Sequence, residues 1–87
     1  MTQELHIASL VLRSDPAQLA AVLAGLDALP VEIAAQDASG KVILLMETEQ
    51  EAAIAETVTR LQLMDGVASA ALVYHHTIHP DEEGAAQ

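Results

Sequence analysis

The chain has 87 residues, enough for one domain, and 52% of them are hydrophobic, so most of the chain is expected to fold. It contains no cysteine, which excludes a disulfide framework, thiol catalysis and cysteine metal sites. The formal charge of −10, with only three Lys and Arg residues, disfavours nucleic acid and anionic membranes as partners and favours a cationic one.

The first predicted elements are a strand and a helix. Residues 5–13 are mainly β-branched and aliphatic and lack Gly and Pro, which predicts a strand. Asp15 and Pro16 supply a capping carboxylate and a preorganised first turn, so a helix is expected to start there. Apolar residues then recur at helical spacing until Pro30 ends the helix.

A β-hairpin is expected next. Residues 31–37 largely alternate between apolar and polar side chains, as a strand with one solvated face does. Residues 38–40, Ala-Ser-Gly, predict a turn, and the aliphatic segment 41–47 predicts the returning strand.

A second helix and a last strand complete the predicted domain. Thr48 and Glu51 have the spacing of a capping box, and apolar residues at helical spacing follow them. Asp65-Gly66 predicts the end of this helix, because glycine readily adopts the left-handed conformation found there. Residues 67–76 predict the last strand.

The predicted order βαββαβ is typical of an α+β, ferredoxin-like fold. Right-handed crossovers then give a four-stranded antiparallel sheet with two helices on one face. We therefore predict a single domain over residues 1–79, followed by a flexible acidic tail over residues 80–87.

One face of such a sheet packs on the helices and the other is usually polar, but three of the predicted strands are apolar on both sides. We assign their bulkier side chains to the core: Ala8, Leu10, Leu12, Val42, Leu44, Met46, Ala70, Leu72 and Tyr74. The residues left on the other face are Ile7, Ser9, Val11, Ile43, Leu45, Ser69, Ala71, Val73 and, at the strand end, His75.

These outward residues would form an apolar surface of small side chains. Contiguous exposed apolar surfaces usually mark interaction sites, so the sequence predicts that this face binds another polypeptide. Two alternatives are homodimerisation through the same face and a tail that folds over it. We expect a monomer or a weak homodimer.

The sequence shows no catalytic constellation and no phosphate-binding glycine loop, so we predict no enzymatic activity and no cofactor. The only histidine cluster spans residues 75–79, where a metal site of His76 and His79 is a weaker alternative to ordinary exposed histidines. The amino terminus has no basic region and no long apolar run, which predicts no signal peptide and a cytoplasmic protein.

Several segments of the chain are similar to one protein family. They are Ser9–Leu12, the helix end at Leu29-Pro30, Ser39-Gly40 with Val42–Glu47, and Asp65-Gly66-Val67 leading to Ala71–His75. Over residues 5–76 the chain resembles the NapD family, and the Leu-Val-Tyr-His ending is the most specific part. Family members often have Pro-Gly after the first helix where this chain has Pro30-Val31, a change that alters a loop and not the sheet.

The resemblance implies a cytoplasmic chaperone that binds the twin-arginine signal peptide of the catalytic subunit of periplasmic nitrate reductase. Such a chaperone holds back export until the molybdenum cofactor is inserted and folding is complete, so the molybdenum belongs to the partner. A peptide with a basic end and an apolar stretch also suits an acidic domain with an apolar face.

Two other classes share the predicted fold: an ACT-like small-molecule-binding regulatory domain and an acylphosphatase-like enzyme. The loop at residues 13–16 lacks the glycine expected for the first and offers only Arg13 for the second.

Overall fold

A computed structural model describes residues 4–79 and follows the predicted order of strands and helices. The strands are β1 Leu5–Ser14, β2 Glu32–Gln36, β3 Lys41–Thr48 and β4 Val67–Ile78. The helices are α1 Leu19–Gly25, with 3-10 turns at Pro16–Gln18 and Leu26–Ala28 on either side, and α2 Glu51–Gln62. The predicted tail, residues 80–87, lies outside the described residues.

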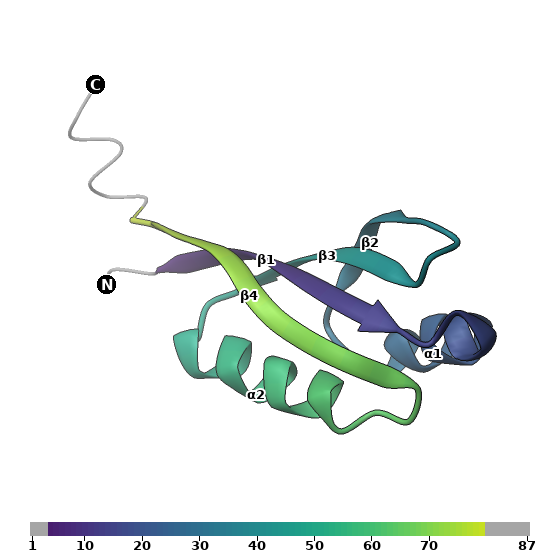
Figure 1. Ribbon diagram of the computed structural model, residues 1–87. Helices are drawn as coiled ribbons and strands as arrows, with labels where there is room; N and C mark the ends of the chain where they lie inside the picture. Colours follow the sequence, from purple (N-terminus) through teal and green to yellow (C-terminus); the bar gives the residue numbers. More distant parts are fainter. Residues whose placement is uncertain (1–3, 80–87) are drawn as a thin grey trace.

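The four strands form one antiparallel sheet in the order β2-β3-β1-β4, so β1 and β3 are central and β2 and β4 are edges. Both helices lie on the same side of the sheet, with α2 running along β4 (Figure 1). This is the predicted ferredoxin-like arrangement. Among residues 4–79, no helix covers the other face of the sheet.

The core lies between the sheet and the helices. Alternate residues of the two central strands are buried: Ala8, Leu10, Leu12, Val42, Leu44 and Met46. The opposite side of the core comes from Val22, Leu26, Ile54 and Leu61, and β4 adds Ala70. Burial of each Leu, Ile or Val side chain contributes about 1.5–3 kcal/mol. Every predicted core residue is buried except Leu72 and Tyr74.

A β-bulge in β4 explains the position of Tyr74. Ser9 pairs with Tyr74 but Leu10 pairs with Leu72, so Val73 is an extra residue without a partner in β1. An extra residue reverses the alternation of the side chains that follow it. Tyr74 therefore lies opposite the helices, 56% exposed, and its predicted place in the core is wrong.

Leu72 differs from the prediction for another reason. It precedes the bulge and lies on the helix side, where it borders a shallow hollow with Ile54 and Val58 of α2. Because β4 is an edge strand, no further strand of the described part of the chain covers this border. Leu72 therefore remains 43% exposed instead of buried.

The helix starts follow the sequence in part. Asp15 caps the first helical turn, because its Oδ1 accepts a hydrogen bond from the amide of Ala17 at 3.0 Å. The predicted capping box of α2 is not formed. Thr48 is held in β3 by its pairing with His6, and its hydroxyl oxygen accepts a hydrogen bond from the amide of Gln50 at 3.1 Å. Gln50 takes the capping position without a side-chain hydrogen bond.

Candidate functional site

The face of the sheet opposite the helices, here called the outer face, is organised in rows across the strands. Directly paired residues of an antiparallel sheet point to the same side, and successive rows on one face are about 7 Å apart. Three of the rows are Glu47–Ile7–His76, Lys41–Arg13–Ser69, and between them Ile43–Val11–Ala71. The remaining row, next to the first, is Glu32–Leu45–Ser9–Tyr74.

The structure brings together most of the residues predicted for this face: Ile7, Ser9, Val11, Ile43, Leu45, Ser69 and Ala71. Val73 and His75 were also predicted to lie on this face, but the structure places them elsewhere. Val73 is the bulged residue, 58% exposed, and His75 pairs with the buried Ala8 and so points to the helix side. The bulge places Tyr74 and His76 in their stead.

The middle of the outer face is apolar, and no segment within residues 4–79 covers it. Val11 and Ile43 are half-buried by their neighbours, and Ala71 is exposed. Leu45 is 37% exposed and Tyr74 is 56% exposed, and the rings of Tyr74 and His76 stack with centroids 6.4 Å apart. A hydrophobic side chain of a partner can therefore reach this surface without rearrangement of the sheet.

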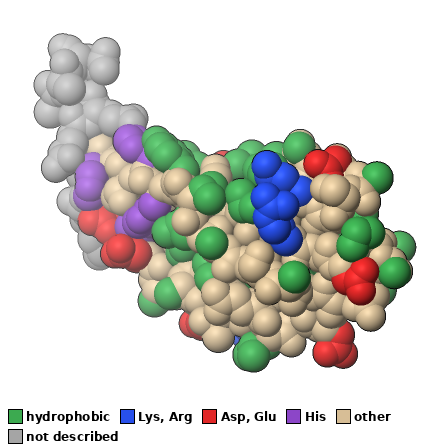
Figure 2. Space-filling model, in the orientation of Figure 1, with side chains coloured by type: hydrophobic (Ala, Val, Ile, Leu, Met, Phe, Trp, Pro, Cys, Tyr) green, Lys and Arg blue, Asp and Glu red, His purple; other side chains and the backbone are tan. Residues whose placement is uncertain are grey.

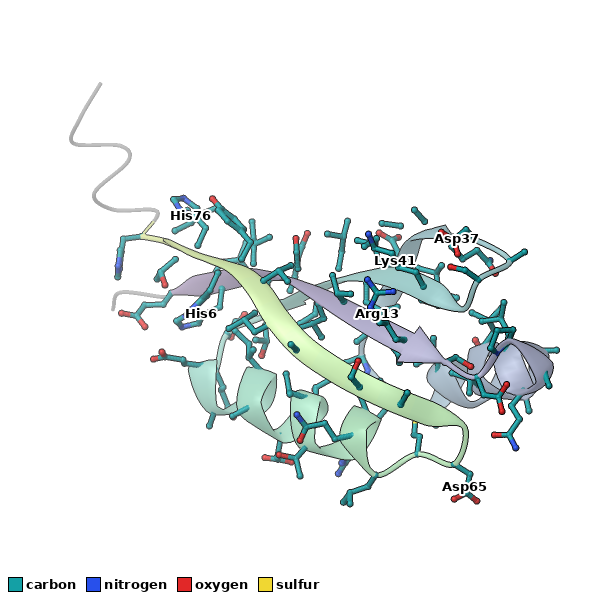
Figure 3. All side chains as sticks on the ribbon, in the orientation of Figure 1. His6, Arg13, Asp37, Lys41, Asp65 and His76 are labelled. Carbon is teal, nitrogen blue, oxygen red and sulfur yellow. The ribbon has the colours of Figure 1, made fainter. Side chains whose placement is uncertain are left out.

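Charged residues lie at the two ends of the same face. The side chains of Arg13 and Lys41 project together at one end, while His76 lies at the other (Figure 3). Figure 2 likewise shows Lys and Arg side chains gathered in one group, well separated from the histidines. Glu47 and Glu32 belong to the same end as His76.

Asp37, in the turn between β2 and β3, lies beside the basic end. The hydroxyl of Ser39 donates a hydrogen bond to its carboxylate, and this bond lowers the pKa of Asp37. The backbone amides of Ser39 and Lys41 and the charge of Lys41 act in the same direction. Asp37 therefore stays ionised at neutral pH and offsets part of the positive charge of Lys41.

A histidine cluster occupies the helix side of the sheet, at the same end as His76. His6 is buried, and its Nδ1 lies 3.0 Å from Nε2 of His75 and 3.2 Å from the hydroxyl of Thr77. Its Nε2 lies 3.4 Å from a carboxylate oxygen of Glu4. These contacts tie β1 to β4. Within residues 4–79, no group of three or more His, Cys, Asp or Glu side chains is arranged to hold a metal ion.

The sequence reasoning missed Tyr74 and His76 as members of the outer face. No glycine or proline marks the bulge in the segment Ala71-Leu72-Val73-Tyr74, so the alternation appeared unbroken. The one usable signal was chemical, because a tyrosine hydroxyl needs a partner or water and is poorly placed in an otherwise aliphatic core.

No helix within residues 4–79 has the length and apolar character needed to cross a membrane.

Comparison with known proteins supports a family assignment. The family model described as "NapD protein" matches residues 5–78, from the start of β1 to the end of β4. Proteins named Chaperone NapD from Escherichia coli K12 and from E. coli O157:H7 are each 30% identical over 80 residues, covering 90% of this chain and 92% of the relative. The relative from Shigella flexneri gives the same values.

The fold comparison agrees. The solution structure of the E. coli Tat proofreading chaperone protein NapD superposes with a TM-score of 0.76 at 29% sequence identity. The superposition covers 87% of this chain and 82% of that chain. The family model spans the whole sheet and both helices, the fold agrees over most of the chain, and the chain belongs to the NapD family.

Proposed function

We propose that this protein binds the twin-arginine signal peptide of the catalytic subunit of periplasmic nitrate reductase in the cytoplasm. Binding would restrain export of that subunit until its cofactor is inserted and its folding is complete. The relatives are named as chaperones, and the solved structure is named as a Tat proofreading chaperone, which supports a binding function over an enzymatic one. The cofactor belongs to the partner in this proposal, and this chain binds none.

The observation that carries the proposal is the outer face. It is apolar at its centre, is covered by no described segment, and spans the two central strands of the sheet. An ordinary sheet face open to solvent carries alternating polar residues instead. A signal peptide contains an apolar stretch that must be kept from water, and this surface offers it a matching contact.

The residues proposed to contact the peptide are those that the structure places on this face: Ile7, Ser9, Val11, Ile43, Leu45, Ser69, Ala71, Tyr74 and His76. Ser9 and Ala71, one in each of the two middle rows, are small and would allow the backbone of the peptide to lie close to the sheet there. We propose that the protein acts as a monomer, or as a weak homodimer that dissociates when the peptide binds to the same face.

Association with the signal peptide should slow as salt is added. The protein carries a formal charge of −10 and the peptide carries an arginine pair, so opposite charges steer their encounter. We expect the association rate constant to fall about tenfold between low and high ionic strength, because the Debye length shortens from about 30 Å to a few ångströms. Stopped-flow fluorescence with a labelled peptide measures this rate.

The dissociation rate should change much less, since the apolar contacts are not screened by salt. A peptide in which both arginines are replaced by glutamine serves as the control, and its association should depend only weakly on salt. An unchanged rate for the arginine peptide would show that charge plays no part in the encounter. Absence of any binding by the arginine peptide would refute the proposed function itself.

A further inference from the structure

The charges of the outer face are separated along the direction of its strands. Glu47 lies beside Ile7, and Glu32 lies beside Leu45 in the adjoining row. Arg13 and Lys41 face each other three rows away from Glu47. With about 7 Å between rows, Glu47 is roughly 20 Å and Glu32 roughly 14 Å from the two basic residues. Of the two rows in between, the one next to Glu47 carries Glu32 at the sheet edge, and the other is apolar.

The acidic end of the outer face is also hollowed. Glu32 and Glu47 border a hollow of about 360 Å³ whose apolar walls include Ile7, Leu45 and Pro30. The ion pairs of the described residues involve neither of these two glutamates. An arginine side chain has an apolar stem and a planar charged head that donates two parallel hydrogen bonds to a carboxylate. Such a hollow, with carboxylates at its rim and apolar walls, suits that combination.

We propose that the outer face binds the signal peptide in one direction only, with the arginine pair at Glu32 and Glu47. From there the apolar stretch of the peptide runs across Leu45, Val11 and Ala71, and its carboxyl-terminal end lies near Arg13 and Lys41. This inference rests on the proposed function. The reverse direction would place the arginines of the peptide against the two basic side chains, and the like charges would repel each other.

Other titratable groups lie at the two ends of the outer face. They reduce the difference in charge between the ends without reversing it. His76 flanks Ile7 on the side away from Glu47, and Asp37 lies beside Lys41. Protonation of His76 would add a positive charge to the acidic end.

The first test is a cycle of matched charge removals measured by calorimetry. The variant Glu32→Gln/Glu47→Gln should bind an arginine-pair peptide about 20-fold more weakly than the original protein, because charge-assisted hydrogen bonds are lost. It should bind the peptide with both arginines replaced by glutamine as well as the original protein does. The control Glu51→Gln/Glu56→Gln removes the same charge from α2, on the other side of the sheet, and should change affinity less than twofold.

An equal loss with both peptides, or an equal loss in the control, would overturn the assignment of the arginine site. That result differs from failure of the proposed function, in which the original protein does not bind the arginine peptide. Circular dichroism of each variant confirms that the fold is retained, as expected for exposed glutamates.

The second test determines the direction in which the bound peptide lies on the outer face. A nitroxide label on the amino-terminal end of the bound peptide should broaden the backbone amide signals of Ile7 and Glu47 and spare those of Arg13 and Lys41. A label on the carboxyl-terminal end should give the opposite pattern. The reversed pattern, or equal broadening at both ends, would overturn the single direction while leaving peptide binding intact.

Discussion

Replacing Ala71 with Asp will leave the domain folded but will weaken binding of the signal peptide about 100-fold, whereas the same replacement at Ala70 will unfold it. The two alanines are neighbours in β4 and face opposite sides of the sheet. Ala71 is exposed on the outer face, so its new carboxylate stays hydrated until a peptide covers it. Ala70 is only 5% exposed and pairs with the fully buried Leu12, so its carboxylate would enter the core.

The comparison is controlled internally, because both variants add one negative charge to the same strand. A buried carboxylate without a partner costs roughly 3–5 kcal/mol, a large part of the 5–10 kcal/mol expected for a domain of this size. Melting curves should show Ala70→Asp unfolded or melting roughly 20 °C lower, and Ala71→Asp within a few degrees of the original protein. Normal peptide binding by Ala71→Asp would show that the peptide does not use the outer face.

Much of the architecture could be predicted because hydrophobic periodicity and turn residues agree along the chain. In β1 and β3 the alternation is unbroken, and each residue assigned to the core or to the outer face lies where predicted. In those strands the bulkier alternate residues indicate which side faces the helices, since both sides are apolar and a shift by one residue would place the smaller set against the core.

The last strand could not be predicted in full, because its sequence is compatible with more than one register. Both faces of β4 carry small or aliphatic residues through Val73, so the position of a bulge has little effect on the apolar pattern. The deciding contacts are between residues far apart in the chain. Ser9 pairs with Tyr74, and His6 contacts His75 and Thr77, all of which require the register that follows the bulge.

The separation of charges on the outer face could not be predicted from the sequence either. Glu32, Glu47, Arg13 and Lys41 come from three different strands. Only the strand order and the pairing register place the two glutamates at one end and the two basic residues at the other. The net charge alone indicates a cationic partner but gives no direction for its binding.

Replacing Gly40 with Ala will destabilise the domain by about 2–4 kcal/mol and lower its Tm by roughly 10–20 °C. Gly40 lies in the turn before β3 with φ of +99°, a conformation that costs other residues energy. A Cβ atom there would overlap the carbonyl oxygen of Ser14. Because the carbonyl of Gly40 accepts a hydrogen bond from the amide of Ser14 at 2.7 Å, the two backbones cannot separate without loss of that bond.

The matched control is Gly25→Ala at the end of α1. Gly25 has an ordinary helical φ of −68°, and a Cβ atom there would meet only the terminal methyl group of Met64, at 2.9 Å. That flexible side chain can move, and alanine favours the helix by about 1 kcal/mol, so the Tm should change by less than about 5 °C. Thermal melts of the two variants make the comparison. If Gly40→Ala melts as the original protein does, the hairpin turn does not need the left-handed glycine, and its contact with Ser14 is not what holds β2 and β3 against the end of β1.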